Sequence, residues 1–330
     1  MIVLGFESSC DETSVSVTKD GQCVLSNVVL SQIDIHKAFG GVVPEIASRE
    51  HVKGITVVLD QAMKEAGVRA NDIDLVAVTQ GPGLIGSLLT GINAAKAFAY
   101  ANDIPIVGVH HIAGHVYANQ IEQDLQFPLI CLVVSGGHTE LLYMKEHYHF
   151  EKLGETQDDA VGEAYDKVAR VLGLGYPGGP IIDRLAVSGK ATYKMPKVET
   201  KRAYDFSYSG LKSHVINTLN TLKMKGETIR KADMVRSFQE AAIEQLIEKS
   251  ILAVDKHQAK MFVVAGGVAA NSHLRKRVYE EFKDVVVSMP AMQYCTDNAA
   301  MMGIAGFYQY QRFGLESSMS LNGDSRLPLK

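Results

Sequence analysis

The same order of segments occurs twice in this 330-residue chain, about 127 residues apart, and this repeat restricts the fold more than any other feature. The β-rich run 2–7 is followed by a polar tip and two more strand-like runs, and the apolar run 129–134 starts the same order again. Each copy continues as alternating strands and helices, which is typical of parallel sheets covered by helices. We therefore expect an α/β fold of two similar lobes, with an interlobe cleft lined by the polar tips.

Hydrophobic periodicity predicts the remaining elements. Apolar residues spaced three to four positions apart indicate helices, and short apolar runs between turn residues indicate strands. We expect strands at 14–18, 23–30, 75–79, 104–109, 141–144, 147–152, 261–265 and 285–288, and helices at 46–66, 84–100, 234–255 and 272–282.

The start of the second copy gives the domain boundary. We assign residues 1–127 to an N-terminal lobe that ends shortly after a histidine-rich segment, and residues 128–330 to a C-terminal lobe. The alternation of strands and helices lapses between about 188 and 231, which we interpret as an insertion into the second lobe. We also expect the C-terminal helix to pack back on the first lobe.

The predicted insertion is strongly basic although the protein is acidic. The whole chain has a net charge of −4, whereas residues 188–231 carry +7 and the remainder −11. Such segregation fits a surface that faces a polyanion, although a solvated face that binds nothing is the commoner explanation. Four aromatic residues are interleaved with the positive charges: Tyr193, Tyr204, Phe206 and Tyr208.

Compartment signals are few. No apolar run approaches the roughly 18 residues that a membrane-spanning helix requires, and the first residues read as a strand rather than a signal peptide. The four cysteines are scattered without a CxxC pair, so free thiols in a reducing cytoplasm are the simplest interpretation. We expect a cytoplasmic protein without membrane contact.

Two histidines follow a predicted strand at the spacing that one metal ion requires. His111 and His115 stand at positions i and i+4 and share one face of the predicted helix. Paired core histidines explain such spacing more often. Asp297 in a later segment is a third candidate ligand, if the fold brings it near. Ile112 stands where a zinc peptidase of the HExxH type has its glutamate, which argues against that activity.

Glycine-rich segments suggest a nucleotide. Gly81 to Gly86 matches GxGxxG but follows the fourth strand, so we interpret it as a packed turn and not as a dinucleotide site. Three other tips lie in the second lobe, at 135–138, 176–180 and 265–268, where backbone amides without Cβ bulk can surround phosphate. No GxxxxGK[ST] sequence occurs, which excludes a P-loop.

Carboxylates near predicted loops or helix starts complete the candidates. Asp11 and Glu12 lie on the first polar tip, and Asp166 and Asp183 lie in the second lobe. Helix capping and solvation are the ordinary explanation for any one of them.

Taken together, these motifs resemble one family over essentially the whole chain. It is the TsaD family of tRNA N6-adenosine threonylcarbamoyltransferases, whose archaeal and eukaryotic relatives are catalytic subunits of the KEOPS complex and which was formerly described as a glycoprotease family. Tyr208, where phenylalanine is commoner, is a conservative departure. The matching segments are 5–13, 41–49, 80–84, 111–115, 134–139, 158–167, 176–180, 206–212, 266–271 and 296–298.

The resemblance implies an actin/Hsp70-like (ASKHA) fold of two RNase-H-like α/β repeats, in agreement with the repeat above. It implies that His111, His115 and Asp297 bind one divalent metal ion, Fe²⁺ or alternatively Zn²⁺. It also implies that the nucleotide-like substrate contacts Val134, Ser135, Gly136, Gly137, His138, Asp166, Gly179, Asp183 and Asn271.

The implied reaction transfers threonylcarbamoyl from threonylcarbamoyl-AMP to N6 of adenosine 37, in tRNAs that read codons beginning with A. The donor would come from a TsaC-like synthase, and the partners would be a TsaB-like paralogue, a TsaE-like ATPase and the tRNA anticodon arm, with ATP as a further possible ligand. We add the hypothesis that Asp11 or Glu12 orients or deprotonates the amine. Two alternatives stay open: an ATP-dependent small-molecule kinase of the same fold, and a non-catalytic scaffold paralogue.

Overall fold

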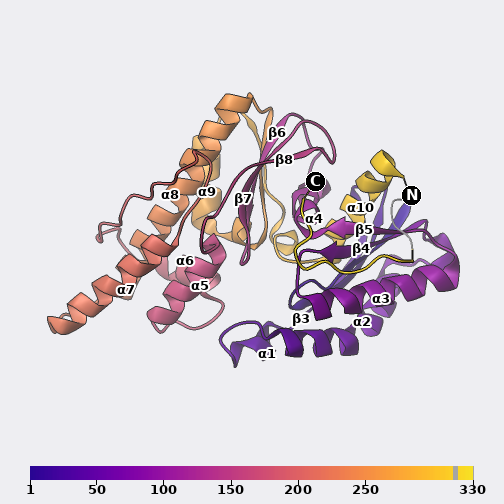
Figure 1. Cartoon of the computed structure of the whole chain (residues 1–330), viewed down its shortest axis with the longest axis horizontal. Helices are drawn as coiled ribbons and strands as arrows, with labels where there is room; N and C mark the ends of the chain where they lie inside the picture. Colours follow the sequence, from indigo (N-terminus) through magenta and orange to yellow (C-terminus); the bar gives the residue numbers. More distant parts are fainter. Residues whose placement is uncertain (315–318, 330) are drawn as a thin grey trace. The chain divides into compact units, whose positions relative to one another are not determined.

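A computed structural model describes residues 1–314 and 319–329. The chain divides into two compact units, each built around one five-stranded sheet (Figure 1). Unit 1 comprises Met1–Leu125, Glu146–Phe150 and Pro290–Lys330, and unit 2 comprises Gln126–Lys145 and Glu151–Met289.

The sheet of unit 1 has the strand order β3-β2-β1-β4-β5. The first three strands pair antiparallel as two consecutive hairpins, and β4 and β5 add in parallel through helical crossovers. Glu12, which the sequence placed on the polar tip, is the first residue of β2. The strands are β1 (Ile2–Glu7), β2 (Glu12–Lys19), β3 (Cys23–Ser31), β4 (Leu75–Gly81) and β5 (Ile106–His110).

Helices cover both faces of this sheet because its strands alternate between two apolar environments. Leu4 and Phe6 pack into a core with residues of α2 (Pro44–Ala66) and α3 (Ile85–Asn102). Gly5, between them, faces α10 (Ala299–Phe313) on the other side. Figure 1 shows α2 and α3 below the sheet and α10 above it. The shorter helices of this unit are α1 (Ile33–Lys37) and α4 (His111–Tyr117).

The sheet of unit 2 repeats this order as β8-β7-β6-β9-β10. Strands β6 and β7 form an antiparallel hairpin, and β9 and β10 add in parallel. The strands are β6 (Leu129–Val134), β7 (Thr139–Met144), β8 (Phe150–Glu155), β9 (Met261–Ala265) and β10 (Val286–Ser288), and the helices are α5 (Val161–Val171), α6 (Gly178–Ala186), α7 (Ser209–Met224), α8 (Lys231–His257) and α9 (Ser272–Glu281).

The repeated strand order confirms the predicted fold class of two similar α/β lobes. Most predicted elements are present, with ends that move by one to three residues. The sequence analysis did not predict α5, α6 or α7. Two of these helices are short, and periodicity identifies helices most reliably over windows of 11 to 18 residues. Among the described residues, no helix has the length and apolar character needed to cross a lipid bilayer.

The GxGxxG segment after β4 packs against neighbouring backbone, as predicted. A Cβ on Gly83 would lie 2.7 Å from the carbonyl oxygen of Ser9, and the amide of Leu84 donates a hydrogen bond of 2.8 Å to the same oxygen. These glycines therefore allow the start of α3 to contact the tip that follows β1. This close packing explains the glycines without a bound dinucleotide.

Gly5 gives a direct test of how closely α10 packs on β1. A Cβ at Gly5 would collide with the carbonyl oxygen of Ala299 and lie 2.9 Å from the amide of Gly303, both of which are backbone atoms that cannot rotate away. We expect Gly5→Ala to destabilise the protein by roughly 1–3 kcal/mol, measured as a shift of the urea midpoint. Gly210→Ala is the matched control, because a Cβ there meets nothing within 4 Å and should leave stability equal or higher. Equal midpoints for Gly5→Ala and the wild type would contradict this packing.

Candidate functional site

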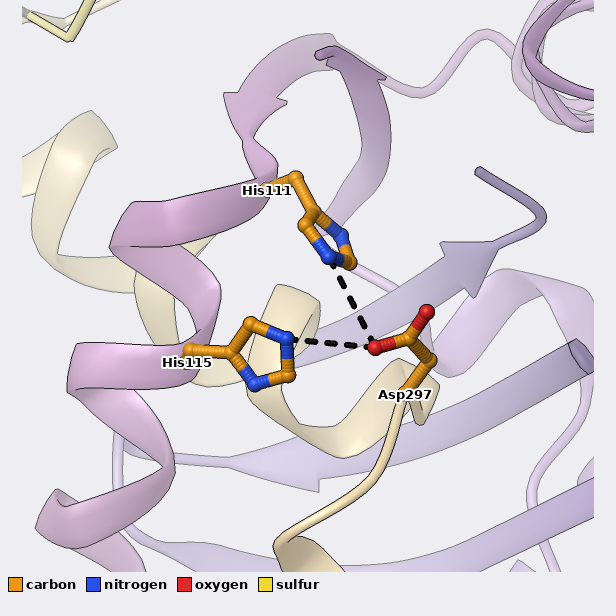
Figure 2. A group of neighbouring side chains, drawn as sticks. All are labelled: His111, His115 and Asp297. Atoms are coloured by element: carbon orange, nitrogen blue, oxygen red, sulfur yellow. Dashed lines mark ion pairs between the residues drawn. The ribbon is translucent and has the colours of Figure 1, made fainter. Parts of the chain in front are cut away.

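The structure brings His111, His115 and Asp297 together within unit 1, as Figure 2 shows. One potential ligand atom from each lies within 4.8 Å of the others. The Asp297 carboxylate oxygen Oδ1 is 3.6 Å from Nε2 of His111 and 3.1 Å from Nε2 of His115. The two imidazole rings are nearly perpendicular, with centroids 4.7 Å apart. Three ligands of this type at this spacing fit one divalent transition-metal ion and leave further coordination positions open.

Local structure explains how the three side chains meet. Helix α4 begins directly after β5, and the His110 side chain caps it by accepting the amide of Ile112. His111 and His115 therefore project from one helix face in adjacent turns. Asp297 stands immediately before α10, whose first turn is capped by Asn298. The amide of Ala299 donates to the Ser14 hydroxyl of β2, which fixes the start of α10 on the sheet.

The surroundings of His115 test most clearly whether the residues fit a metal ion. His115 is 1% exposed, and neither of its ring nitrogens makes a hydrogen bond. A buried imidazole without partners is costly, because at least one N–H or lone pair loses its interaction with water. Nε2 nevertheless points at Asp297, so a cation between the two groups would satisfy both. The residues present thus fit a bound metal.

Two further residues of the site, Glu7 and Ser9, were given no role by the sequence analysis. Glu7 ends β1 fully buried, with Oε2 3.2 Å from Nδ1 of His111, and the Ser9 hydroxyl lies 3.2 Å from the same nitrogen. The sequence did contain a signal for Glu7, because a carboxylate at the end of an otherwise apolar buried strand is unusual and often has a function.

The charges around His111 favour a cation. Burial by itself would lower the pKa of this imidazole, but the carboxylates of Asp297 and Glu7 outweigh burial and raise the pKa to about 9 in the absence of metal. Burial likewise would raise the pKa of Glu7, but the charge and hydrogen bond of His111 hold it below its ordinary value. The site therefore stabilises positive charge between the two carboxylates.

Asp11 lies on the tip that connects β1 with β2, and Glu12 is the first residue of β2. Burial is the largest influence on Glu12, and with the nearby carboxylates of Asp297 and Asp11 it raises the pKa of Glu12 well above its ordinary value. His51 of α2 holds this tip through two hydrogen bonds: its Nε2 donates to the carbonyl of Cys10, and its Nδ1 accepts from the Thr13 hydroxyl. Since burial lowers the pKa of His51, the neutral ring is the form that makes these two contacts.

In unit 2 the predicted substrate loop joins β6 to β7. The amide of Ser135 donates to the carbonyl of His138, the amide of His138 donates to the Ser135 hydroxyl, and the amide of Gly162 in α5 donates to the Ser135 carbonyl. A Cβ at Gly136 or Gly137 would meet no atom within 4 Å, and neither has a positive φ. Among the described residues, neither packing nor backbone conformation requires glycine at these two positions.

The other predicted substrate residues of unit 2 make hydrogen bonds at the starts of nearby helices. Asp166 of α5 accepts the amide of Gly178 at 2.6 Å and so caps α6. Asp183 of α6 accepts the amide and hydroxyl of Ser272. Asn271 caps α9 through the amide of Leu274 and also donates to Gln239.

These three side chains thus have structural partners, and the ordinary explanation of capping holds for each. Gly179 is different, because a Cβ there would meet nothing within 4 Å. Val134 at the end of β6 lies against Gly266, whose φ of +93° and contact with the Val134 carbonyl require glycine. Among these residues, the structure brings Asp183 next to Asn271, because Asp183 accepts hydrogen bonds from the adjacent Ser272.

The basic segment 188–231 includes an irregular stretch and α7. Of the four aromatic residues interleaved with its charges, Phe206 and Tyr208 are fully buried. The backbone of Phe206 forms an isolated β-bridge with Thr156. Because both rings are buried in unit 2, they cannot stack on a base. Lys197 and Lys201 are exposed and form no ion pair within the part of the chain that the structure describes.

The Asp158 carboxylate anchors this segment to the loop before α5, where the neighbouring Asp159 also pairs with Lys212. Asp158 accepts four hydrogen bonds, from the amides of Tyr208 and Ser209 and from the hydroxyls of Ser207 and Ser209. The start of α7 is thereby fixed to the residues that lead into α5. In α5, the amide of Gly162 donates to the carbonyl of Ser135.

Solved structures with the same architecture share little sequence with this chain. The crystal structure of full-length HypF in its phosphate- and nucleotide-bound form superposes with a TM-score of 0.61 at 14% identity, over 96% of this chain, which spans 47% of HypF. Component A of the (R)-2-hydroxyglutaryl-CoA dehydratase of Acidaminococcus fermentans superposes with a TM-score of 0.54 at 14% identity, over 94% of this chain and 99% of that chain. These structures show the fold alone. Fold and site together define a two-lobed, actin-like α/β protein with a candidate His-His-Asp metal centre.

Sequence comparison gives the family. The profile of TsaD, tRNA N6-adenosine threonylcarbamoyltransferase, matches residues 23–304. The enzyme of this name from Staphylococcus saprophyticus is 57% identical over all of this chain and 97% of the relative, and that from Staphylococcus haemolyticus is 56% identical over the same shares. The chain belongs to the TsaD family, and it is a transferase.

The Asp158 anchor predicts a dependence of stability on acid. Burial alone would raise the pKa of Asp158, but the hydrogen bonds from Ser207, Tyr208 and Ser209 outweigh it and lower the pKa below its ordinary value of 3.8. The stabilisation is therefore complete above pH 3.8 and is lost as pH falls through the lowered pKa. We expect Asp158→Asn to lower the melting temperature at pH 7 by roughly 2–5 °C and to differ less from the wild type near pH 3.

Asp255→Asn is the matched control for this experiment, since Asp255 is exposed on α8. Its melting temperature should follow that of the wild type at each pH. If Asp158→Asn also does so, the anchor contributes nothing to stability.

Proposed function

We propose that this protein transfers the threonylcarbamoyl group from threonylcarbamoyl-AMP to N6 of the adenosine at position 37 of tRNAs that read codons beginning with A. The product would be N6-threonylcarbamoyladenosine. The observation that carries the proposal is the meeting of His111, His115 and Asp297 in a chain that matches the family over its whole length. A small-molecule kinase of this fold has no use for such a centre, and a non-catalytic scaffold would not need one.

The acceptor explains why the site needs this chemistry. The exocyclic amine of adenosine is a weak nucleophile, because its lone pair is delocalised into the ring. The enzyme must therefore make the donor carbonyl more electrophilic and hold the two reactants in a fixed geometry. A metal ion held by His111, His115 and Asp297 would supply Lewis acidity toward the threonylcarbamoyl group.

The chain's own residues would do the rest. In unit 2, the open glycines of the β6–β7 loop and Gly179 would let backbone amides approach the AMP portion of the donor. Asp166, Asp183 and Asn271 would hold the surrounding helix starts, and Val134, Ser135 and His138 would complete the loop. In unit 1, Asp11 or Glu12 would orient the amine or take its proton, and burial together with the nearby carboxylates raises the pKa of Glu12 well above its ordinary value.

The nature of the metal and the partners belong to the same proposal. Two imidazoles and one carboxylate suit Fe²⁺, which we favour, and they also suit Zn²⁺. We propose the tRNA anticodon arm as the macromolecular substrate, a TsaB-like paralogue and a TsaE-like ATPase as partners, a TsaC-like synthase as the source of the donor, and the cytoplasm as the place of action.

Transfer of labelled threonine is the deciding measurement. Purified protein, supplied with its partner subunits, is incubated with threonylcarbamoyl-AMP and a tRNA that reads a codon beginning with A. We expect label in the tRNA with the wild type, loss of at least 100-fold with His111→Ala, and with Asp11→Ala a reduced turnover at unchanged metal content. No transfer by folded, metal-loaded wild type would overturn the function, and full turnover by Asp11→Ala would overturn the role of Asp11.

Charge reversal tests the basic segment as the tRNA surface. Lys197 and Lys201 are exposed, so Lys197→Glu with Lys201→Glu should weaken tRNA binding more at low salt than at high salt. Each lost phosphate contact should reduce the slope of log affinity against log salt by about 1. Lys260→Glu with Lys283→Glu is the matched control, because Lys260 precedes β9, whereas Asn271 follows β9 and Val134 ends the parallel strand β6. Equal effects of both double variants would place the tRNA elsewhere.

A further inference from the structure

The buried carboxylate of Glu7 accepts hydrogen bonds from Ser9 and Thr79, and His111 is its one ion-pair partner among the described residues. Its Oε1 accepts the amide of Ser9, and its Oε2 accepts the Thr79 hydroxyl at 2.6 Å. The side chain is 0% exposed. Among the ion pairs of the described residues, the only group that meets Glu7 is the imidazole of His111.

An unpaired charge cannot stay buried at low cost. Removing a carboxylate from water costs several kcal/mol unless an opposite charge or several hydrogen bonds compensate it. The two donors Ser9 and Thr79 compensate part of this cost. The remainder must come through His111, which stands between Glu7 on one side and Asp297 on the other.

The contact with Glu7 also determines which nitrogen of His111 is free. An ionised carboxylate can only accept hydrogen bonds, so the 3.2 Å contact between Oε2 and Nδ1 requires that Nδ1 carries the proton. The Ser9 hydroxyl on the same nitrogen can accept from it as well. Once the ring has lost its second proton, the lone pair of His111 is therefore on Nε2, the nitrogen that faces Asp297. His115 has no such partner at its Nδ1.

We propose that Glu7 is a positioning residue of the metal centre: it holds His111 in the tautomer that coordinates through Nε2, and it supplies a second negative charge beside that of Asp297. Two carboxylates then balance a divalent cation, so that the buried centre is neutral. Carboxylates behind a metal-bound histidine commonly act in this way, and their loss weakens metal binding by roughly 10- to 100-fold. The inference rests on the proposed metal centre and assigns it a residue outside the three ligands.

Zinc affinity measures this role without any turnover. Metal-free protein is titrated with Zn²⁺ in competition with a chromophoric chelator, and folding is checked by circular dichroism and thermal unfolding. Glu7→Gln keeps the size of the side chain and an oxygen that can accept from His111, but removes the charge. We expect its Zn²⁺ dissociation constant to rise by roughly 10- to 100-fold, and that of Glu7→Leu, which also loses the acceptor, to rise further.

Glu140→Gln is the matched control, because Glu140 is likewise a buried carboxylate but pairs with Lys152 in unit 2. Its Zn²⁺ affinity should equal that of the wild type. Wild-type affinity in folded Glu7→Gln and Glu7→Leu would overturn the role of Glu7 and leave the metal centre standing. Failure of the wild type to bind Zn²⁺ above background would overturn the centre itself.

Nitrogen-15 NMR of the zinc-loaded wild type tests the tautomer without any variant. We expect the His111 signals to show a protonated Nδ1 and a zinc-bound Nε2. A zinc-bound Nδ1 would overturn the proposal even if the variants of Glu7 failed to fold.

Discussion

The direct packing of α10 on the backbone of β1 is the contact on which the candidate site depends. Gly5 allows it, because any Cβ there would collide with the carbonyl of Ala299. The Ser14 hydroxyl then accepts the first amide of the helix, and Asn298 caps its first turn. Asp297 precedes these fixed residues and so reaches the histidines of α4 from the far end of the chain. A small shift of α10 would separate the carboxylate from both imidazoles.

Electrostatics gives the same site its chemical character. Glu7 is fully buried at the end of a sheet strand, His115 is buried without hydrogen-bond partners, and His111 lies between two carboxylates. Each feature by itself would destabilise the fold. A divalent cation between them would compensate all three features, and for this reason they indicate a cation site more strongly than the spacing of two histidines does.

Unit 2 contains both residues that hold helix starts in place and glycines that leave the space beside the backbone open. Its capping residues, such as Asp166 and Asn271, are satisfied within the protein and hold the helix starts in place. Its open glycines, Gly136 and Gly137, have no packing role. The contrast separates positions that shape the loop from positions where a ligand can come close, a distinction that the glycine-rich sequence alone does not make.

The sequence by itself determined the repeat, the apolar strands and the pairing of His111 with His115, since sheet cores and helix faces impose short periods that are visible in a linear pattern. The residues also gave Asp297 as a third candidate ligand and 135–138 as a candidate nucleotide-binding tip, and the resemblance of the motifs assigned them to one metal and one substrate. Only the tertiary structure decided that Asp297 stands within reach of both histidines, that Glu7 contacts His111, and that Phe206 and Tyr208 are buried. These contacts join segments that are distant along the chain, and their distances depend on how helices pack on a sheet, which no local pattern encodes.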